Sequence, residues 1–242
     1  MSVSLTCDLV AQTLTDTVRW DGRRYLIALG QALGEVPPDF EGAGYRAAFR
    51  ERAVNRQWFA SLLASNAYME GYSAGRLQQY AGVVGSDALK RDLKRHAADE
   101  ARHSRSFAGL IFQIFPHLDS AWLRQEAEAH VVDLTLITPC PADYPTPTDD
   151  EILNSLILMN LFEIKALYLG NYLKPFAAAH APAEAAEVVQ ESVARIAQDE
   201  CYHIAYTARH IDTLLDRFGL DDVASRIAGF VEMMNKAEDY SI

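Results

Sequence analysis

One five-residue pattern occurs twice in the chain, as Asp99-Glu100-Ala101-Arg102-His103 and as Asp199-Glu200-Cys201-Tyr202-His203. Both copies lie in segments rich in Ala, Leu, Glu and Arg, which favour helix. On a helix, residues three apart lie one turn from each other on the same face, so the Glu and the His of each copy can bind one ligand. A single Glu-x-x-His is common by accident, but two copies that each follow an Asp are expected on the order of once in a thousand such chains. The repeat is therefore the strongest functional signal in the sequence.

The sequence around the repeat predicts an all-α fold. Only 9 Pro and 13 Gly interrupt the 242 residues, and no segment shows the strict alternation of a half-buried strand. Apolar residues at spacings of three and four predict four long helices. These span about Tyr45–Ala81, about Asp87–Pro116 with Ser86 as N-cap, a segment that begins at Thr148, and about Pro182–Phe218. Pro175 is expected to kink or interrupt the third of them.

Shorter helices are expected outside these four, within residues 4–34, at about 119–134 and at about 221–237. Two short hairpin turns and one long crossover between the second and third long helices resemble the connectivity of a ferritin-like four-helix bundle. We expect one domain over residues 1–242, with the core bundle at about 45–218. Residues 1–40 are expected to form an N-terminal helical extension that covers the bundle or pairs two chains as a homodimer.

Hairpin geometry predicts two more functional carboxylates, because facing residues in a helical hairpin lie equally far from its turn. Counting back from the turn near 84 by the distance to Glu100 ends close to Glu70, which shares a face with apolar residues of the first long helix. The same count from the turn near 181 by the distance to Glu200 ends close to Glu163, which again lies on an apolar face. An ionised carboxylate on such a face needs a cation.

The predicted site therefore joins four carboxylates and two imidazoles, namely Glu70, Glu100, His103, Glu163, Glu200 and His203. Four buried negative charges are too costly for one domain, whereas two divalent cations neutralise them. Oxygen-rich ligation with one imidazole per metal suits iron or manganese better than zinc, so we expect two iron ions, or manganese or a mixed manganese–iron pair. Asp99 and Asp199 are expected to accept the imidazole N–H of the opposite copy.

This order of ligands resembles that of the ferritin-like di-iron carboxylate proteins, in which Glu, Glu-x-x-His, Glu and Glu-x-x-His follow one another. The Asp before each Glu-x-x-His is more similar to the oxygen-activating branches, such as bacterial multicomponent monooxygenases, acyl desaturases and p-aminobenzoate N-oxygenases, than to iron-storage ferritin. The compact length is also similar to that of aldehyde-deformylating oxygenases. The resemblance implies a di-iron centre in which Glu70, Glu100, Glu163 and Glu200 are the catalytic carboxylates.

The sequence departs from these families at several places. The additional histidine of the N-oxygenases is replaced by Ile196, while His96 lies one turn before Glu100 and can supply a further ligand from the other side. Alternatively, His96 is a partly exposed histidine on the helix surface with no role in metal binding. Asn160, one turn before Glu163, is a candidate to bind a ligand carboxylate or the substrate. Three scattered cysteines exclude the four-cysteine module of rubrerythrins.

The amino-acid composition argues against some classes of binding partner. The formal net charge is −11 and no Lys/Arg stripe is present, which argues against nucleic acid and against an anionic membrane surface. The sequence shows neither a targeting segment nor an uninterrupted apolar run of transmembrane length, so a soluble, cytoplasmic chain is expected. The odd number of widely spaced cysteines gives no disulfide framework.

The expected function is that of an enzyme, a di-iron oxygenase or oxidase that uses O2 to oxidise a small, largely apolar metabolite. Hydroxylation, N-oxygenation, desaturation and C–C cleavage all remain open. No flavin or iron–sulfur motif is present, so an external electron donor such as a ferredoxin or a reductase is implied. The alternatives are a ferroxidase or peroxide-detoxifying iron-handling protein without an organic substrate, and a helical bundle that binds no metal.

Overall fold

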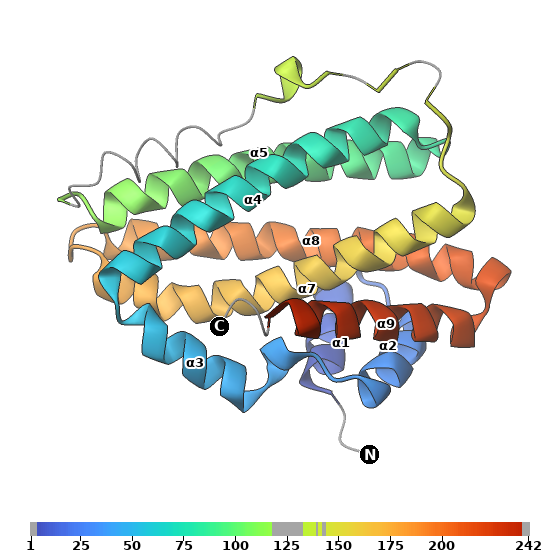
Figure 1. The fold of residues 1–242 in the computed structure, drawn as a ribbon, viewed down its shortest axis with the longest axis horizontal. Coiled ribbons are helices and arrows are strands. Elements are labelled where there is room, and N and C mark those ends of the chain that lie inside the picture. Colours follow the sequence, from blue (N-terminus) through green and yellow to red (C-terminus); the bar gives the residue numbers. More distant parts are fainter. Residues whose placement is uncertain (1–3, 118–132, 139, 142–143, 239–242) are drawn as a thin grey trace. The chain divides into compact units, whose positions relative to one another are not determined.

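The computed structural model describes residues 4–117, 133–138, 140–141 and 144–238 (Figure 1). Every regular element in these residues is a helix, so the predicted all-α class is confirmed for them. The helices are α1 (Leu5–Val18), α2 (Arg23–Glu35), η1 (Asp39–Glu41), α3 (Ala43–Ala53), α4 (Arg56–Val83), α5 (Asp87–Ile114), η2 (Leu134–Leu136), α7 (Asp149–His180), α8 (Ala186–Phe218) and α9 (Leu220–Glu238). Most of the helix expected at 119–134 lies outside the described residues.

The chain folds into two compact units. The first comprises Met1–Ala48, Thr148–Leu169 and Ala197–Ile242, and the second comprises Phe49–Pro147 and Gly170–Ile196. Helices α7 and α8 each contribute one part to either unit. The second unit contains the copy of the repeat that ends at His103, and the first unit contains the copy that ends at His203. The prediction of a single domain stays a prediction.

In the second unit, α4 and α5 form an antiparallel hairpin and lie side by side (Figure 1). The apolar face predicted for the first long helix is buried, at Phe59, Leu63, Ala67, Ala74 and Leu77. The hydroxyl of Ser104 donates to the carbonyl of Ala67 at 2.7 Å, which ties α5 to α4 in the buried interior. The N-cap predicted at Ser86 is confirmed, because its hydroxyl accepts from the backbone N–H of Leu89.

The single helix predicted over 45–81 is wrong, because the structure divides it into α3 and α4. Asn55 lies in the break and its side-chain oxygen accepts the N–H groups of Gln57 and Trp58, both at 3.0 Å. This N-cap satisfies donors that a helix start leaves open and so begins a new helix. Phe49 of α3 packs edge-on against Trp58 of α4, with ring centroids 5.7 Å apart.

At two prolines the structure differs from the predicted helix boundaries. Helix α7 is not interrupted at Pro175 but continues through it to His180, so only the predicted kink stays a prediction. Leu173 and Ala177 on either side are buried, so packing offsets the backbone hydrogen bond that proline removes. Helix α8 begins at Ala186 rather than near Pro182. Pro182 instead precedes a turn in which its carbonyl accepts from the N–H of Ala185 at 2.9 Å.

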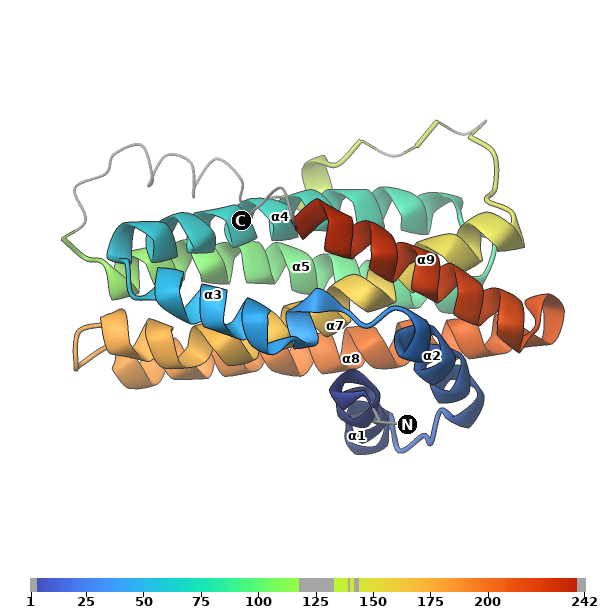
Figure 2. The same ribbon diagram turned by 60° about the horizontal axis from the view of Figure 1, so that its bottom comes forward.

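In the first unit, α2 lies beside α9 (Figure 2). Val10 and Leu14 of α1 and Leu29 of α2 are buried, so the N-terminal helices form part of the core of this unit. Gly219 separates α8 from α9 with φ +80°. Because glycine has no Cβ, it adopts this left-handed conformation readily, and its N–H closes the last turn of α8 on Leu215.

Among the described helices, α7 is long and apolar enough to cross a membrane by length and composition, with a mean hydropathy of 1.5 over 18 residues. Within that window, 44% is buried inside the structure. Buried polar side chains on the same helix, Asn160 and Glu163, are typical of a core helix in a soluble protein. Solubility therefore stays a prediction.

Candidate metal centre

The second unit brings Glu70 of α4 to Glu100 and His103 of α5. One ligand atom from each of the three side chains lies within 4.8 Å of the other two, and the group could hold a metal ion. Nδ1 of His103 is 3.5 Å from Oε1 of Glu100, as the spacing of one helical turn predicts. Glu100 and His103 are buried and Glu70 is half-buried.

The surroundings of Glu100 favour its charged form. Burial alone would raise the pKa of its carboxyl group, but hydrogen bonds with Glu70, His103 and His96, together with the charge of His96, hold the pKa well below its usual value. Nε2 of His96 is 3.3 Å from Oε1 of Glu100, and its ring is buried rather than partly exposed. A carboxylate can bind a cation directly, whereas an imidazole does so only in its neutral form.

The first unit brings together the corresponding three side chains of the other copy. Nδ1 of His203 is 3.0 Å from Oε2 of Glu200 and 3.4 Å from Oε2 of Glu163. All three residues are buried, His203 completely. Each unit thus contains one Glu and one Glu-x-x-His pair, in the combination that hairpin counting predicts. Within the residues that the structure describes, the protein is helical and contains buried Glu and His side chains that could bind metal.

The two aspartates that precede the Glu-x-x-His pairs differ in their surroundings. Asp99 is buried, and its Oδ1 accepts from Nη2 of Arg102 at 2.8 Å. Nε of Arg95 lies 3.8 Å from its other oxygen, so two guanidinium groups flank this carboxylate. Asp199 is half-buried. Their predicted contact with the histidine of the opposite copy stays a prediction.

Asn160 has other partners than those the sequence suggests. Its side-chain oxygen accepts from the hydroxyl of Tyr25 at 2.6 Å, and its amide donates to Oγ1 of Thr207 and to the carbonyl of Ile204. None of these partners is a predicted ligand. Tyr25 precedes Asn160 by 135 positions, so no local pattern could have identified it.

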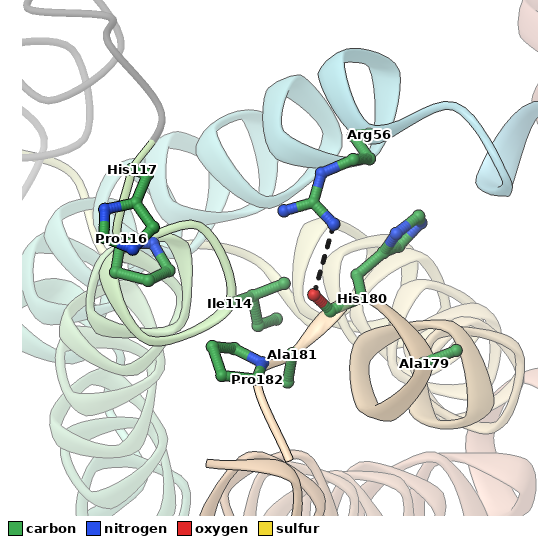
Figure 3. Close-up of a pocket in the computed structure, with 8 residues that line it drawn as sticks. All are labelled: Arg56, Ile114, Pro116, His117, Ala179, His180, Ala181 and Pro182. Atoms are coloured by element: carbon green, nitrogen blue, oxygen red, sulfur yellow. Dashed lines mark hydrogen bonds between the residues drawn. The ribbon is translucent and has the colours of Figure 1, made fainter. Parts of the chain in front are cut away.

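A pocket in the second unit lies at the ends of α5 and α7, and none of the predicted ligands lines it (Figure 3). It has a volume of about 440 Å³ and is lined by Arg56, Ile114, Pro116, His117, Ala179, His180, Ala181 and Pro182. Arg56 donates to the carbonyl of His180 and lies over the ring of Phe115, while Nε2 of His180 contacts the carbonyl of Ala53 at 2.7 Å. The side chains of Arg56 and His180 thus contact backbone carbonyls that the ends of α7 and α3 leave without a partner in the helix.

No protein-family model, curated protein or solved structure matches the chain. The ferritin-like assignment consequently rests on the motifs and their spacing, without a fold match.

The chemistry of the donor set fits a metal. In the second unit Glu70, Glu100 and His103 could hold a metal ion. In the first unit the buried side chains of Glu163 and His203 lie 3.4 Å apart. Carboxylates outnumber imidazoles in the predicted set, and the three cysteines are not part of it. Such oxygen-rich sets suit hard or borderline divalent cations better than thiophilic ones.

Proposed function

We propose that the protein is a non-haem di-iron oxygenase or oxidase that uses O2 to oxidise a small, largely apolar metabolite. One observation carries the proposal. Each unit contains the same trio of one Glu and one Glu-x-x-His pair, in the chain order of the ferritin-like di-iron carboxylate proteins. We propose with it a ferritin-like four-helix bundle.

Iron is the favoured metal because of the donor types. Two divalent ions would balance the charge of Glu70, Glu100, Glu163 and Glu200, and a donor set with more carboxylates than imidazoles suits iron. Manganese or a mixed manganese–iron pair has similar requirements. Zinc would favour thiolates or more histidine. Bound iron supplies the redox chemistry toward O2 that no side chain of the chain can provide.

The chain's own residues would hold, orient and shield this centre. The four glutamates and His103 and His203 bind the metals, and His96 adds an imidazole beside Glu100. Asp99 and Asp199 fix the imidazole orientation by accepting N–H groups. Buried apolar neighbours such as Ala67, Leu156 and Leu167 exclude water from the centre.

The proposal also names partners. An external reductant, such as a ferredoxin or a reductase, would return electrons to the metals after each turnover, since the chain has no flavin or iron–sulfur motif. O2 and a metabolite are the substrates. Neither nucleic acid nor a membrane is part of the proposed activity, and a homodimer is compatible with it.

Elemental analysis of protein reconstituted with Fe(II) under anaerobic conditions tests the centre. We expect about two irons per chain, as one ion for each trio requires. Fewer than about one iron, with no replacement metal, would refute a metalloenzyme. Exposure to labelled O2 in the presence of a reductant and a metabolite extract then tests the reaction. An oxidised product that depends on Glu200 supports an oxygenase or oxidase, whereas O2 consumption that yields only ferric mineral or water would support iron handling instead.

A further inference from the structure

A chain of buried hydrogen bonds crosses the first unit from α2 through α7 to α8. The hydroxyl of Tyr25 donates to Oδ1 of Asn160 at 2.6 Å, and Nδ2 of Asn160 donates to Oγ1 of Thr207 at 2.9 Å. Oγ1 of Thr207 in turn donates to the backbone carbonyl of His203 at 2.6 Å. Tyr25, Asn160 and Thr207 are each at most 2% exposed. Water therefore does not compete for these hydrogen bonds.

The chemistry of the groups fixes the direction of every bond. Nδ2 of Asn160 also donates to the carbonyl of Ile204 at 3.1 Å, an atom that can only accept, so the amide has a single orientation. Burial raises the pKa of Tyr25 far above neutrality, so its hydroxyl keeps the proton that it donates. With both amide hydrogens and the oxygen engaged, Asn160 joins three helices in one geometry.

Two members of this series of hydrogen bonds, Asn160 and Thr207, lie one helical turn from predicted metal ligands. Asn160 precedes Glu163 by three residues on α7, and Thr207 follows His203 by four on α8. A shift of α7 along α8 by one residue would move Asn160 away from Thr207 and Ile204, and would equally move Glu163 away from His203, which is now 3.4 Å from it. The same relative position of the helices thus serves both contacts.

We propose that Tyr25, Asn160 and Thr207 are positioning residues that hold α7 and α8 in the register at which Glu163 meets Glu200 and His203. This inference rests on the proposed metal centre. It also gives the N-terminal helix α2 a role in the centre, because Tyr25 is the donor that orients the amide. Polar groups suit such a role better than apolar ones, since an apolar contact tolerates sliding whereas a saturated hydrogen-bond network does not.

Titration of the metal-free full-length protein with Co(II), followed by the visible absorption of the bound ion, tests the proposal. We expect the wild type to bind two ions. Tyr25→Phe, Asn160→Leu and Thr207→Val should each weaken one of them by about 10–100-fold, the usual effect of removing an outer-sphere partner, and leave the other unchanged. Glu200→Ala identifies the affected ion, because it removes a ligand of the same trio.

Two further variants separate positioning from general stability. Thr207→Ser keeps the hydroxyl and should restore Co(II) affinity. Asn55 lies at the start of α4 and its side-chain oxygen caps that helix. Asn55→Ala should therefore lower the thermal midpoint without changing Co(II) affinity. Should Thr207→Val lose its helical circular dichroism, Tyr25→Phe, which removes one oxygen atom, carries the test.

The outcomes distinguish the inference from the proposed function. If the wild type binds two ions and Tyr25→Phe and Asn160→Leu bind both as tightly, the positioning role is refuted and the metal centre stands. If the variants weaken both ions equally, the effect is global and the positioning role is again refuted. If the wild type binds no Co(II), Fe(II) or Mn(II), the metal centre itself is wrong and the inference falls with it.

Discussion

Nδ1 of His203 lies 3.0 Å from Oε2 of Glu200, and Nδ1 of His103 lies 3.5 Å from Oε1 of Glu100. In both copies of the repeat the same ring nitrogen faces the carboxylate one turn earlier. A shared ligand would thus meet Nδ1 and a glutamate oxygen in each unit, while Nε2 is left to an outer partner such as an aspartate. Two distant parts of the sequence therefore make the same local geometry.

Removal of a ligand carboxylate should abolish one metal without unfolding the protein. We expect Glu100→Ala and Glu200→Ala each to lose about one iron per chain, because each deletes one side chain of a trio. Wild-type protein should gain thermal stability when Fe(II) is added, since a ligand that binds only the folded state stabilises it, and the gain should shrink in both variants. Metal analysis and thermal scans measure the two effects. Glu191→Ala, at an exposed position on α8, is the control, and unchanged iron content in the ligand variants would contradict the assignment.

His96→Ala should weaken the metal held beside Glu100. The ring of His96 is 1% exposed and 3.3 Å from Oε1 of Glu100, so its removal takes away either a ligand or the group that orients one. We expect a loss of affinity of about 10–100-fold, measured by competition with a chelator of known affinity. His117→Ala, at an exposed position beyond the end of α5, is the control. Equal metal affinity in the His96→Ala and His117→Ala variants would show that His96 has a purely structural role.

Asn55→Ala should destabilise the protein by about 1 kcal/mol, because it removes the N-cap that begins α4. Chemical denaturation of the metal-free protein measures the change. Asn66, on the same helix, donates only to the carbonyl of Leu62 four residues earlier. Asn66→Ala should therefore be neutral or slightly stabilising, as alanine has the higher helix propensity. Similar losses in both variants would show that the break at Asn55 does not depend on its cap.

Glu41→Gln should lower stability near neutral pH and lose this effect in acid. Burial raises the pKa of Glu41, but hydrogen bonds from Thr6, Ser4 and the N–H of Leu5 outweigh it and leave the pKa below its usual value. A depressed carboxyl pKa contributes stability above the unfolded value, about 4.3, and the contribution is lost as the pH falls through the folded value. Glu41 caps the start of α1, so we expect about 1 kcal/mol at pH near 7.

Thermal midpoints of wild type and Glu41→Gln, compared at pH about 7 and about 3, measure this contribution. The difference should be clear at the higher pH and small at the lower. Glu51→Gln, at an exposed position, should differ from wild type at neither pH. A difference for Glu41→Gln that persists unchanged in acid would show that the carboxylate charge is not its cause.

Local patterns predicted the helical class and several helix boundaries, while the ligand set stays a prediction. The N-cap at Ser86 and the starts of α5 and α7 follow from residues within one turn of each boundary. Equal counting from a hairpin turn ended close to Glu70 and Glu163, because helices rise by a constant amount per residue. The same reasoning failed at Asn55, where a side-chain cap competes with continued helix, and α7 continues through Pro175, where packing outweighs the lost hydrogen bond.

The sequence by itself determined that the chain is helical and that Glu and His pair at one-turn spacing in two places, since both depend on interactions within a few residues. Only the tertiary structure decided which side chains meet from distant segments. It brings Asn160 into hydrogen bonds with Tyr25 and Thr207, and Glu41 into a hydrogen bond with the start of α1. Such contacts depend on how helices pack, and packing is set by many weak interactions across the whole core that no short stretch of sequence contains.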